Sequence, residues 1–174
     1  MSKAAIENPV INSPFAEPAR HFLTTDTGEV TAEITAGRRI SDYLIPIPQP
    51  KKRAAQGVLP GIGPDRFARE ETRLVNELRD EVGRWRRAGH EGVTPITRFL
   101  LDYWTNPDRE RKLFFCQIEA LETAIFITEV ARKYGKGWID DRLRAANDSS
   151  NPGLPRIALK MATGSGKTVV MAML

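Results

Sequence analysis

The chain has 174 residues, of which 41% are hydrophobic and 28% are charged, and its formal net charge is +4. This composition supports a packed core and excludes a chain that is disordered throughout, while the mild positive charge fits either a nucleic-acid partner or ordinary surface composition. Cys116 is the single cysteine, which excludes an internal disulfide, and with His21 and His90 as the only histidines it leaves too few ligands for a zinc site.

Residues 1–64 are predicted to form an extended N-terminal arm with a hairpin and a proline-rich linker. Strand-like residues at 21–25 and 30–35 flank a short connection that contains Gly28, as is typical of a β-hairpin. In residues 41–64, repeated prolines exclude a helix and favour extended or polyproline geometry. The same segment carries the basic cluster Lys51, Lys52 and Arg53.

Residues 65–152 are predicted to be a helical region, and its first helix spans residues 65–88. Apolar residues recur there mostly at three- and four-residue steps, which indicates one apolar face, and Gly89 marks the end. Arg84, Arg86 and Arg87 crowd the last turn. They could form a patch for DNA phosphates with Trp85 as a stacking residue. We favour the simpler interpretation, in which basic residues complement the helix dipole and Trp85 belongs to the apolar face.

Two further helices are predicted from their start signals. Thr94-Pro95 has the form of an N-cap followed by a first-turn proline and opens a short helix that runs through Trp104. Asn106-Pro107 repeats this form and predicts a longer helix that ends at Gly135. A polar loop is expected at residues 147–153, because Asn, Asp, Ser, Pro and Gly dominate it.

The motif that carries chemistry lies at residues 153–174. An apolar segment, 157–161, reads as a strand and leads into a glycine loop and then an apolar segment able to form a helix. Gly164 and Gly166 let successive N–H groups converge on an anionic oxygen, Lys167 adds a mobile cation, and the Thr168 hydroxyl is placed to ligate Mg²⁺. The predicted nucleotide-binding residues are therefore Thr163, Gly164, Ser165, Gly166, Lys167 and Thr168.

One position departs from the strict phosphate-loop pattern, since Met161 stands six positions before Lys167, where that pattern has glycine. The departure argues against a kinase- or GTPase-type loop but not against a helicase-type loop. Gln117 precedes Lys167 by 50 positions. Many superfamily 2 helicases use an upstream glutamine to read adenine, because an amide accepts from N6 and donates to N7 of that base. Alone, such a residue is more often an ordinary solvated side chain; beside this loop, we predict an adenine contact.

The segments LFFCQIEALETAIFITEV and NPGLPRIALKMATGSGKTVVMAML resemble the large restriction subunit of type III restriction–modification systems, which are superfamily 2 DNA translocases. The leader NPVINSPFAEPARHF and the text DYLIPIPQPKK are similar to one bacterial subgroup of that family, so the resemblance covers almost the whole chain. It implies an α/β fold in which residues 153–174 begin a RecA-like ATP-binding domain. It also implies ATP and Mg²⁺ as ligands, double-stranded DNA as a partner of the full-length protein, and a methyltransferase or specificity subunit.

By this resemblance the chain is expected to be an N-terminal piece of an ATP-dependent, DNA-cleaving hydrolase that stops just after its Walker A motif. The acidic Walker B strand, the arginine fingers and the nuclease carboxylates would lie beyond Leu174, so no catalytic residue is assigned here and no hydrolysis is expected. We expect a cytoplasmic protein, since no signal peptide or membrane-spanning run is apparent. A repair-type superfamily 2 helicase and a non-catalytic interaction module are the alternatives.

Overall fold

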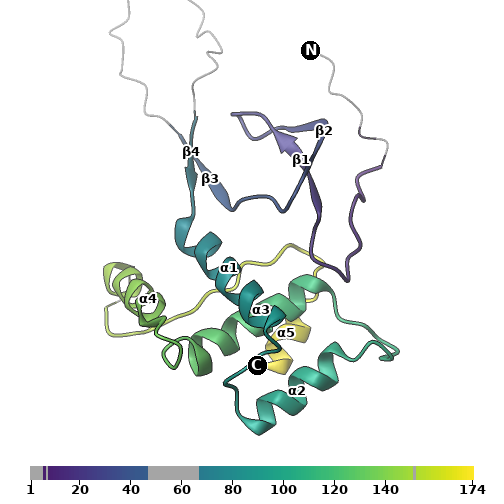
Figure 1. Cartoon of the computed structure of the whole chain (residues 1–174). Coiled ribbons are helices and arrows are strands. Elements are labelled where there is room, and N and C mark those ends of the chain that lie inside the picture. The colour runs from purple at the N-terminus through teal and green to yellow at the C-terminus, as the bar shows by residue number, and fades with distance from the viewer. Residues whose placement is uncertain (1–5, 7, 47–66, 151) are drawn as a thin grey trace, which may run out of the picture. The chain divides into compact units, whose positions relative to one another are not determined.

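The computed structural model describes residues 6, 8–46, 67–150 and 152–174. Within them the chain is mixed α/β, with small antiparallel hairpins first and helices after them (Figure 1). The chain divides into two compact units, one formed by residues 1–12 and 18–73 and the other by residues 13–17 and 74–174. Each unit is described by itself below.

The first unit opens with the predicted hairpin. Strand β1 (Arg20–Thr24) pairs antiparallel with β2 (Val30–Ala36), in a register that sets Arg20 opposite Ala36. Gly28 takes a φ of 84° in the connection, and its N–H donates to the Thr25 carbonyl at 2.9 Å. A left-handed backbone is unstrained for glycine, which explains the tight turn. The prediction of this hairpin is confirmed.

A second hairpin, which the sequence did not predict, follows in the same unit. Strand β3 (Asp42–Pro46) pairs antiparallel with β4 (Phe67–Glu71), and Asp42 stands opposite Glu71. The predicted helix over 65–88 is therefore wrong in its first part. A hairpin is recognised from a short turn between its strands, whereas these strands are separated by residues 47–66. Those residues, with the Lys51 to Arg53 cluster and most of the linker prolines, lie outside the described residues.

The second unit is helical, and its first two helices lie where the sequence places them. Helix α1 (Arg73–Arg87) begins later than predicted but ends before Gly89, which has a φ of 81°. Helix α2 (Pro95–Thr105) has Thr94 as its N-cap, whose hydroxyl oxygen accepts from the Thr97 N–H at 3.2 Å. The prediction of an N-cap followed by a first-turn proline is confirmed. This cap satisfies one of the N–H groups that a helix start leaves unpaired.

The next helix begins later than predicted. Asn106-Pro107 opens a turn, in which the Asn106 side-chain oxygen accepts from the Asp108 N–H at 2.8 Å. Helix α3 (Phe115–Ile125) starts well after it and continues as a single π-helical stretch, η1 (Phe126–Val130). Asparagine before proline favours such a turn because its side chain bonds the backbone two residues on. Gly135, with a φ of 71°, follows the end of this helical stretch, as expected.

Helix α4 (Gly137–Ser150) was not separately predicted, and the loop expected at residues 147–153 is helical as far as Ser150. The Asn147 side chain joins this last turn to the following segment, because its amide donates to the Arg156 carbonyl at 2.9 Å and its oxygen accepts from the Arg156 N–H at 3.0 Å. Asn147 therefore lies in the last turns of a helix, although its residue type is also typical of a loop.

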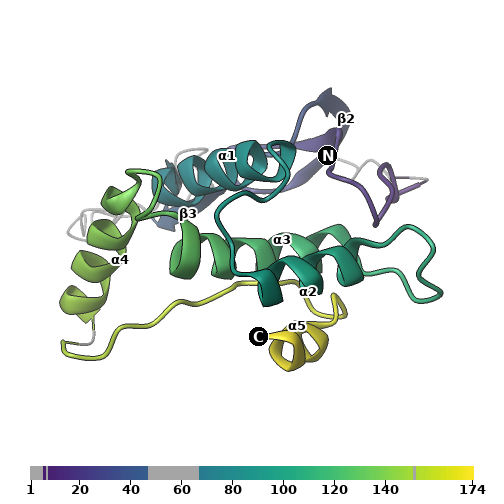
Figure 2. The ribbon, with the colours of Figure 1, turned by 60° about the horizontal axis from the view of Figure 1, so that its bottom comes forward.

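The helices of the second unit enclose its main core. Val82 and Trp85 of α1, Leu101 of α2, Phe126 and Val130 of η1 and Ile139 of α4 are all buried there. In Figure 2, α3 lies below α1 with α2 next to it, and the short helix α5 (Lys167–Met173) lies beside α3. Helix α3 packs against this core through Ile125 and contacts α5, which carries part of the candidate site.

Residues 157–161 are not a strand. They run extended towards α5 and form no ladder with any described strand, and the described residues contain no RecA-like parallel sheet. A parallel strand needs neighbours on both sides for its N–H and C=O groups, and the described part of the chain supplies none. No helix among the described residues is long and apolar enough to cross a membrane.

Candidate nucleotide-binding site

The glycine loop predicted from the sequence joins the extended segment to α5. Gly164 and Gly166 have φ values of 79° and 78°, in the left-handed region that favours glycine. A Cβ atom at Gly164 would meet no heavy atom within 4 Å, so backbone conformation, not space, requires glycine there. The Ser165 hydroxyl donates to the Ala162 carbonyl at 2.7 Å and closes the turn. The loop therefore contains two residues in the left-handed conformation just before the helix begins.

This loop leaves backbone donors unused. Within the described residues, the N–H groups of Gly164, Gly166, Lys167 and Thr168 donate to no acceptor, and Gly164, Lys167 and Thr168 are exposed. Consecutive N–H groups in a loop of this kind form a concave site for an anion. The unused backbone N–H groups of this loop are therefore suited to binding a phosphate group.

Lys167 is the cation of this loop. Its Nζ donates to the carbonyls of Met161 at 3.2 Å and Ala162 at 3.1 Å, so the ammonium folds back across the start of the loop. Carbonyl oxygens are weaker partners for an ammonium than phosphate oxygens, which carry full charge. The side chain is exposed and makes no ion pair within the described residues, so its charge is available to an anionic ligand.

Thr168 lies exposed on the first turn of α5. Its predicted role as a Mg²⁺ ligand stays a prediction, because a hydroxyl alone makes a weak site and oxygen ligands for Mg²⁺ usually include a carboxylate. No group of three or more His, Cys, Asp or Glu side chains able to hold a metal occurs in the described part of the chain. Any metal would therefore depend on oxygen ligands that arrive with the nucleotide or from elsewhere.

Gln117 lies beside this loop, although it is far from it in sequence. Its Nε2 is 3.5 Å from the Gly166 carbonyl oxygen, and its Oε1 accepts from the Phe114 N–H at 2.8 Å. The side chain is buried, with 5% of the residue exposed. A Cβ at Gly166 would come within 2.2 Å of Nε2, so the two residues approach as closely as glycine allows. The structure thus brings together the two elements that the sequence singled out.

The amide of Gln117 is already engaged on both sides in this arrangement. It satisfies one N–H at the start of α3, where a helix lacks internal partners, and it contacts the loop. Reading adenine would require the same oxygen and nitrogen to face the base. The adenine contact stays a prediction, whereas the structure shows a contact between Gln117 and the loop.

Helix α5 is held against α3 by a small apolar cluster. Val170 is 3% exposed and packs on Ala120 and Leu121 of α3. The partly buried residues around them are Trp104, Leu159, Met161 and Met173. Val169, Met171 and Leu174 of the same segment are exposed, whereas Val170 is buried and Met173 is partly buried. The extended segment contributes packing even without a sheet.

A buried charged cluster on the other side of α3 escaped the sequence analysis. The Glu122 carboxylate is fully buried and accepts from Arg86 Nε at 2.8 Å, from Arg86 Nη2 at 2.5 Å and from His90 Nε2 at 2.7 Å. Glu122 follows Ile118 by four positions, so the two side chains lie on the same face of the helix. A carboxylate at such a position is the signal that could have revealed it, since buried charges are normally paired.

The environment of Glu122 keeps it ionised. Burial alone would raise the pKa of this carboxyl, but the hydrogen bonds from His90 and Arg86, together with the charge of Arg86, outweigh burial and hold the pKa below its ordinary value. Burial likewise opposes the charge of Arg86, and the bonds to Glu122 raise the pKa of the guanidinium in spite of it. The cluster is therefore a charged, hydrogen-bonded support between α1 and α3.

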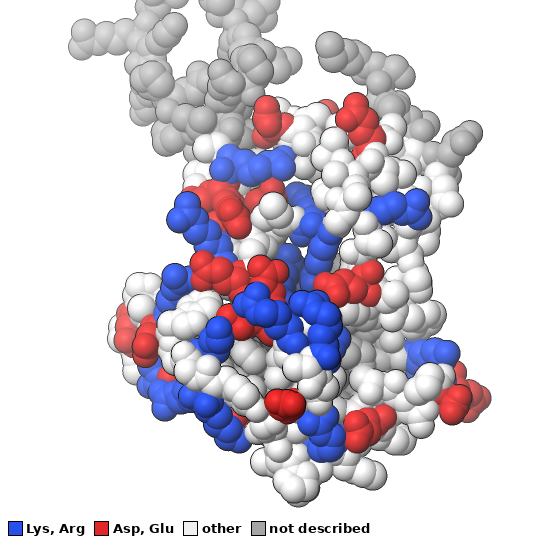
Figure 3. All heavy atoms as spheres, in the orientation of Figure 1, with Lys and Arg blue, Asp and Glu red and all other residues white. Residues whose placement is uncertain are grey.

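This cluster bears on the two interpretations of the arginines at the end of α1. Arg86 is occupied by Glu122, and Arg84 pairs with Glu81 at 2.8 Å. Trp85 is buried in the core, and its Nε1 donates to the Glu91 carbonyl at 2.8 Å. On the face that Figure 3 shows, acidic side chains are interleaved with basic ones. Trp85 therefore belongs to the apolar face, as the simpler interpretation holds, whereas Arg86 pairs with the buried Glu122, a role that neither interpretation included.

No protein-family model, no curated protein and no solved structure matches this chain.

Proposed function

We propose that this chain is the ATP-binding, N-terminal part of a superfamily 2 DNA motor similar to the large subunit of type III restriction–modification systems. One observation carries the proposal: residues 163–168 combine two left-handed glycines, several unused N–H groups and an exposed lysine in one loop. A glycine turn that served only to connect a segment to a helix would require neither the lysine nor the threonine after it.

In this proposal, the loop residues and Gln117 have different roles in nucleotide binding. The loop N–H groups hold phosphate oxygens, and Lys167 leaves the Met161 and Ala162 carbonyls to neutralise their charge. Thr168 is the residue that would hold Mg²⁺. ATP hydrolysis supplies the free energy for movement along DNA in proteins of this class. Gln117 fixes the position of Gly166 and, by the resemblance, would contact adenine.

The DNA partner and the methyltransferase or specificity subunit are proposed from the resemblance and the net charge of +4. The loop geometry fits a repair-type superfamily 2 helicase equally well, because both classes bind ATP in the same way. A nuclease motif in the protein that carries these residues would favour the restriction subunit.

Nucleotide binding tests the proposal. A fluorescent ATP analogue is titrated with Mg²⁺ into the wild type, Lys167→Ala and Lys160→Ala. Lys160 is exposed and makes no hydrogen bond or ion pair among the described residues, so it controls for the loss of one positive charge near the loop. We expect Lys167→Ala to weaken binding at least about tenfold, the loss of roughly one charge-assisted hydrogen bond, and Lys160→Ala to change it little. Equal affinities for all three proteins would reject the proposal.

A further inference from the structure

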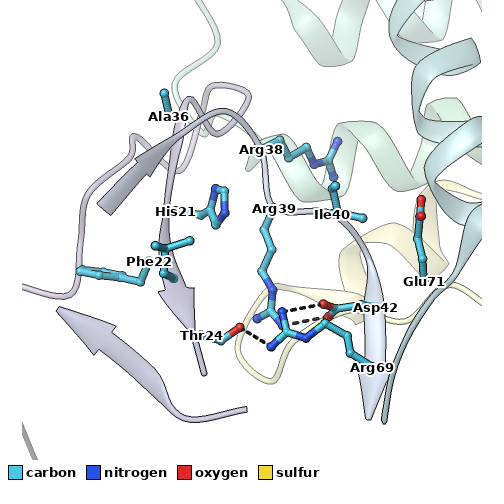
Figure 4. Close-up of a pocket in the computed structure, with 11 residues that line it drawn as sticks. His21, Phe22, Thr24, Ala36, Arg38, Arg39, Ile40, Asp42, Arg69 and Glu71 are labelled. Carbon is cyan, nitrogen blue, oxygen red and sulfur yellow. Dashed lines mark hydrogen bonds and ion pairs between the residues drawn. The ribbon is translucent and has the colours of Figure 1, made fainter. Parts of the chain in front are cut away.

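The first unit contains a pocket with a volume of about 530 Å³ between its two hairpins (Figure 4). It is lined on one side by β1, from which His21 and Thr24 contribute, and on the other by the segment that carries Arg39. Arginines outnumber carboxylates among the lining residues, since Arg38, Arg39 and Arg69 face Asp42 and Glu71. A pocket of this volume is within the range of small-ligand sites, and its charge is positive.

Two of these arginines converge on one carboxylate. Arg39 Nη2 lies 3.0 Å from Asp42 Oδ1, and Arg69 Nη1 lies 3.1 Å from Asp42 Oδ2. Two positive charges thus share a single negative one, which leaves them incompletely neutralised. In Figure 4 both guanidinium groups point towards Asp42 and Thr24 from different segments of the unit. An anion placed there would relieve the repulsion between them.

The two arginines differ in how firmly they are held. Arg69 also donates to the Thr24 hydroxyl at 2.9 Å and the Thr25 carbonyl at 2.7 Å, so three partners fix its orientation. Arg39 has Asp42 as its only partner among the described residues, and its side chain is 51% exposed. The remaining N–H groups of Arg39 are therefore available, in the planar arrangement that matches phosphate oxygens.

Of the other polar groups at the pocket, the Thr24 hydroxyl can donate to an anion, while His21 is engaged with the backbone. His21 Nδ1 donates to the Gly37 carbonyl at 2.8 Å, which fixes the ring beside the segment that carries the arginines. The Thr24 hydroxyl accepts from Arg69, so its own hydrogen is free to be donated. A pair of arginines flanked by a hydroxyl donor is an arrangement that recognises phosphate groups.

From this geometry we propose that the pocket binds a phosphate group, supplied by a nucleic-acid backbone or by a free phosphate compound. Arg39 is the movable ligand and Arg69 the fixed one. The site lies in the first unit and uses none of residues 163–168, so it is separate from the proposed nucleotide site.

The test uses the chain with Lys167→Ala, so that the glycine loop does not contribute. Backbone amide signals of Gly37, Arg39 and Asp42 are followed by NMR while inorganic phosphate, and separately a short DNA duplex, is added at constant ionic strength. We expect these signals to shift on addition of phosphate. Adding Arg39→Gln should weaken binding about tenfold, the usual loss for a charge-assisted contact. Arg39→Lys, which keeps the charge but loses the planar fork, should weaken it less.

Arg84→Gln is the matched control, because Arg84 is also exposed and also pairs with one carboxylate, Glu81. It should leave binding unchanged. Tighter binding of the duplex than of phosphate would assign the site to a nucleic-acid backbone, and binding of phosphate alone would assign it to a free compound; both support the site. The proposal is overturned if phosphate shifts the signals no more than chloride does, or if Arg39→Gln and Arg84→Gln weaken binding equally.

Discussion

The Nε2 atom of Gln117 lies 3.5 Å from the carbonyl oxygen of Gly166, and the two residues are 49 positions apart in the chain. The contact couples the start of α3 to the turn of the glycine loop, because the same side chain accepts from the Phe114 N–H. Loop geometry in this protein thus depends on a helix of the core as well as on its own glycines.

Replacing Gln117 with alanine should therefore weaken nucleotide binding whatever the base. The substitution removes the contact to Gly166 and leaves the Phe114 N–H without its acceptor. We expect GTP to lose affinity roughly three- to tenfold, as for the loss of one net hydrogen bond, and ATP to lose at least as much. Titrations of both nucleotides measure it. Undiminished binding of both would show that the loop needs no support from α3.

The ratio of the ATP and GTP affinities tests a different role of the same residue. If Gln117 contacts adenine, as its position before the loop predicts, the wild type prefers ATP. This preference should fall by roughly 1 to 3 kcal/mol in Gln117→Ala, the value of one paired amide contact. A ratio that is the same in wild type and variant would contradict the adenine contact and leave only the support of the loop.

Acid should destabilise the helical unit through Glu122. Its folded-state pKa lies below the ordinary value of 4.5, since Arg86 and His90 outweigh the effect of burial. The ionised carboxylate therefore stabilises the fold above about that pH, and this contribution is lost as the pH falls through the lower folded-state pKa. Urea unfolding followed by tryptophan fluorescence measures it, because Trp85, Trp104 and Trp138 all lie in this unit.

The substitution Glu122→Gln should lower the free energy of unfolding by about 3 kcal/mol, because the partly buried Arg86 would lose its closest counter-charge and keep only the longer pairs with Glu17 and Glu119. Glu77→Gln is the control: Glu77 pairs with Arg142 on the surface, where such pairs contribute less than about 1 kcal/mol. The acid sensitivity below pH 4.5 should be smaller in Glu122→Gln than in the wild type. Equal losses in the two variants would contradict the structural role of the buried cluster.

Helix α5 should be protected from hydrogen exchange, contrary to the fraying that its short length alone would predict. Val170→Ala should cost about 2 kcal/mol and release this protection, because Val170 is buried against Ala120 and Leu121. Val169→Ala removes the same atoms from a side chain that is 42% exposed and should change little. Rapid exchange throughout α5 in the wild type would show that this packing does not persist.

Local signals explain which elements could be predicted from the sequence. The turn at Gly28, the cap at Thr94 and the glycine loop each depend on residues a few positions apart, and each lies where it was expected. The pairing of β3 with β4 depends on partners across residues 47–66, so no local pattern indicates it. The helical spacing of apolar residues led to the prediction of a helix over 67–71. In the structure these residues form β4, which pairs with β3.

In the candidate site too, local features could be predicted from the sequence, whereas contacts between distant residues could not. Gly164, Gly166 and Lys167 could be assigned from spacing alone, because the backbone conformation is set by the glycines themselves. The contact of Gln117 with Gly166 and the pairing of Arg86 with Glu122 arise from packing between helices. The sequence therefore indicated where the glycine turn lies, whereas the partners of Arg86 and the engagement of the Gln117 amide required the structure.

The central claim is that residues 163–168 form a phosphate-binding loop, and the loop amides themselves test it most directly. Backbone NMR signals of Gly164, Gly166, Lys167 and Thr168 are followed while Mg²⁺ and ATP are added, with Gly153, an exposed glycine in a separate turn, as the internal control. We expect these four signals to shift together and saturate, while the Gly153 signal does not move. Signals that stay in place at saturating ATP would contradict it.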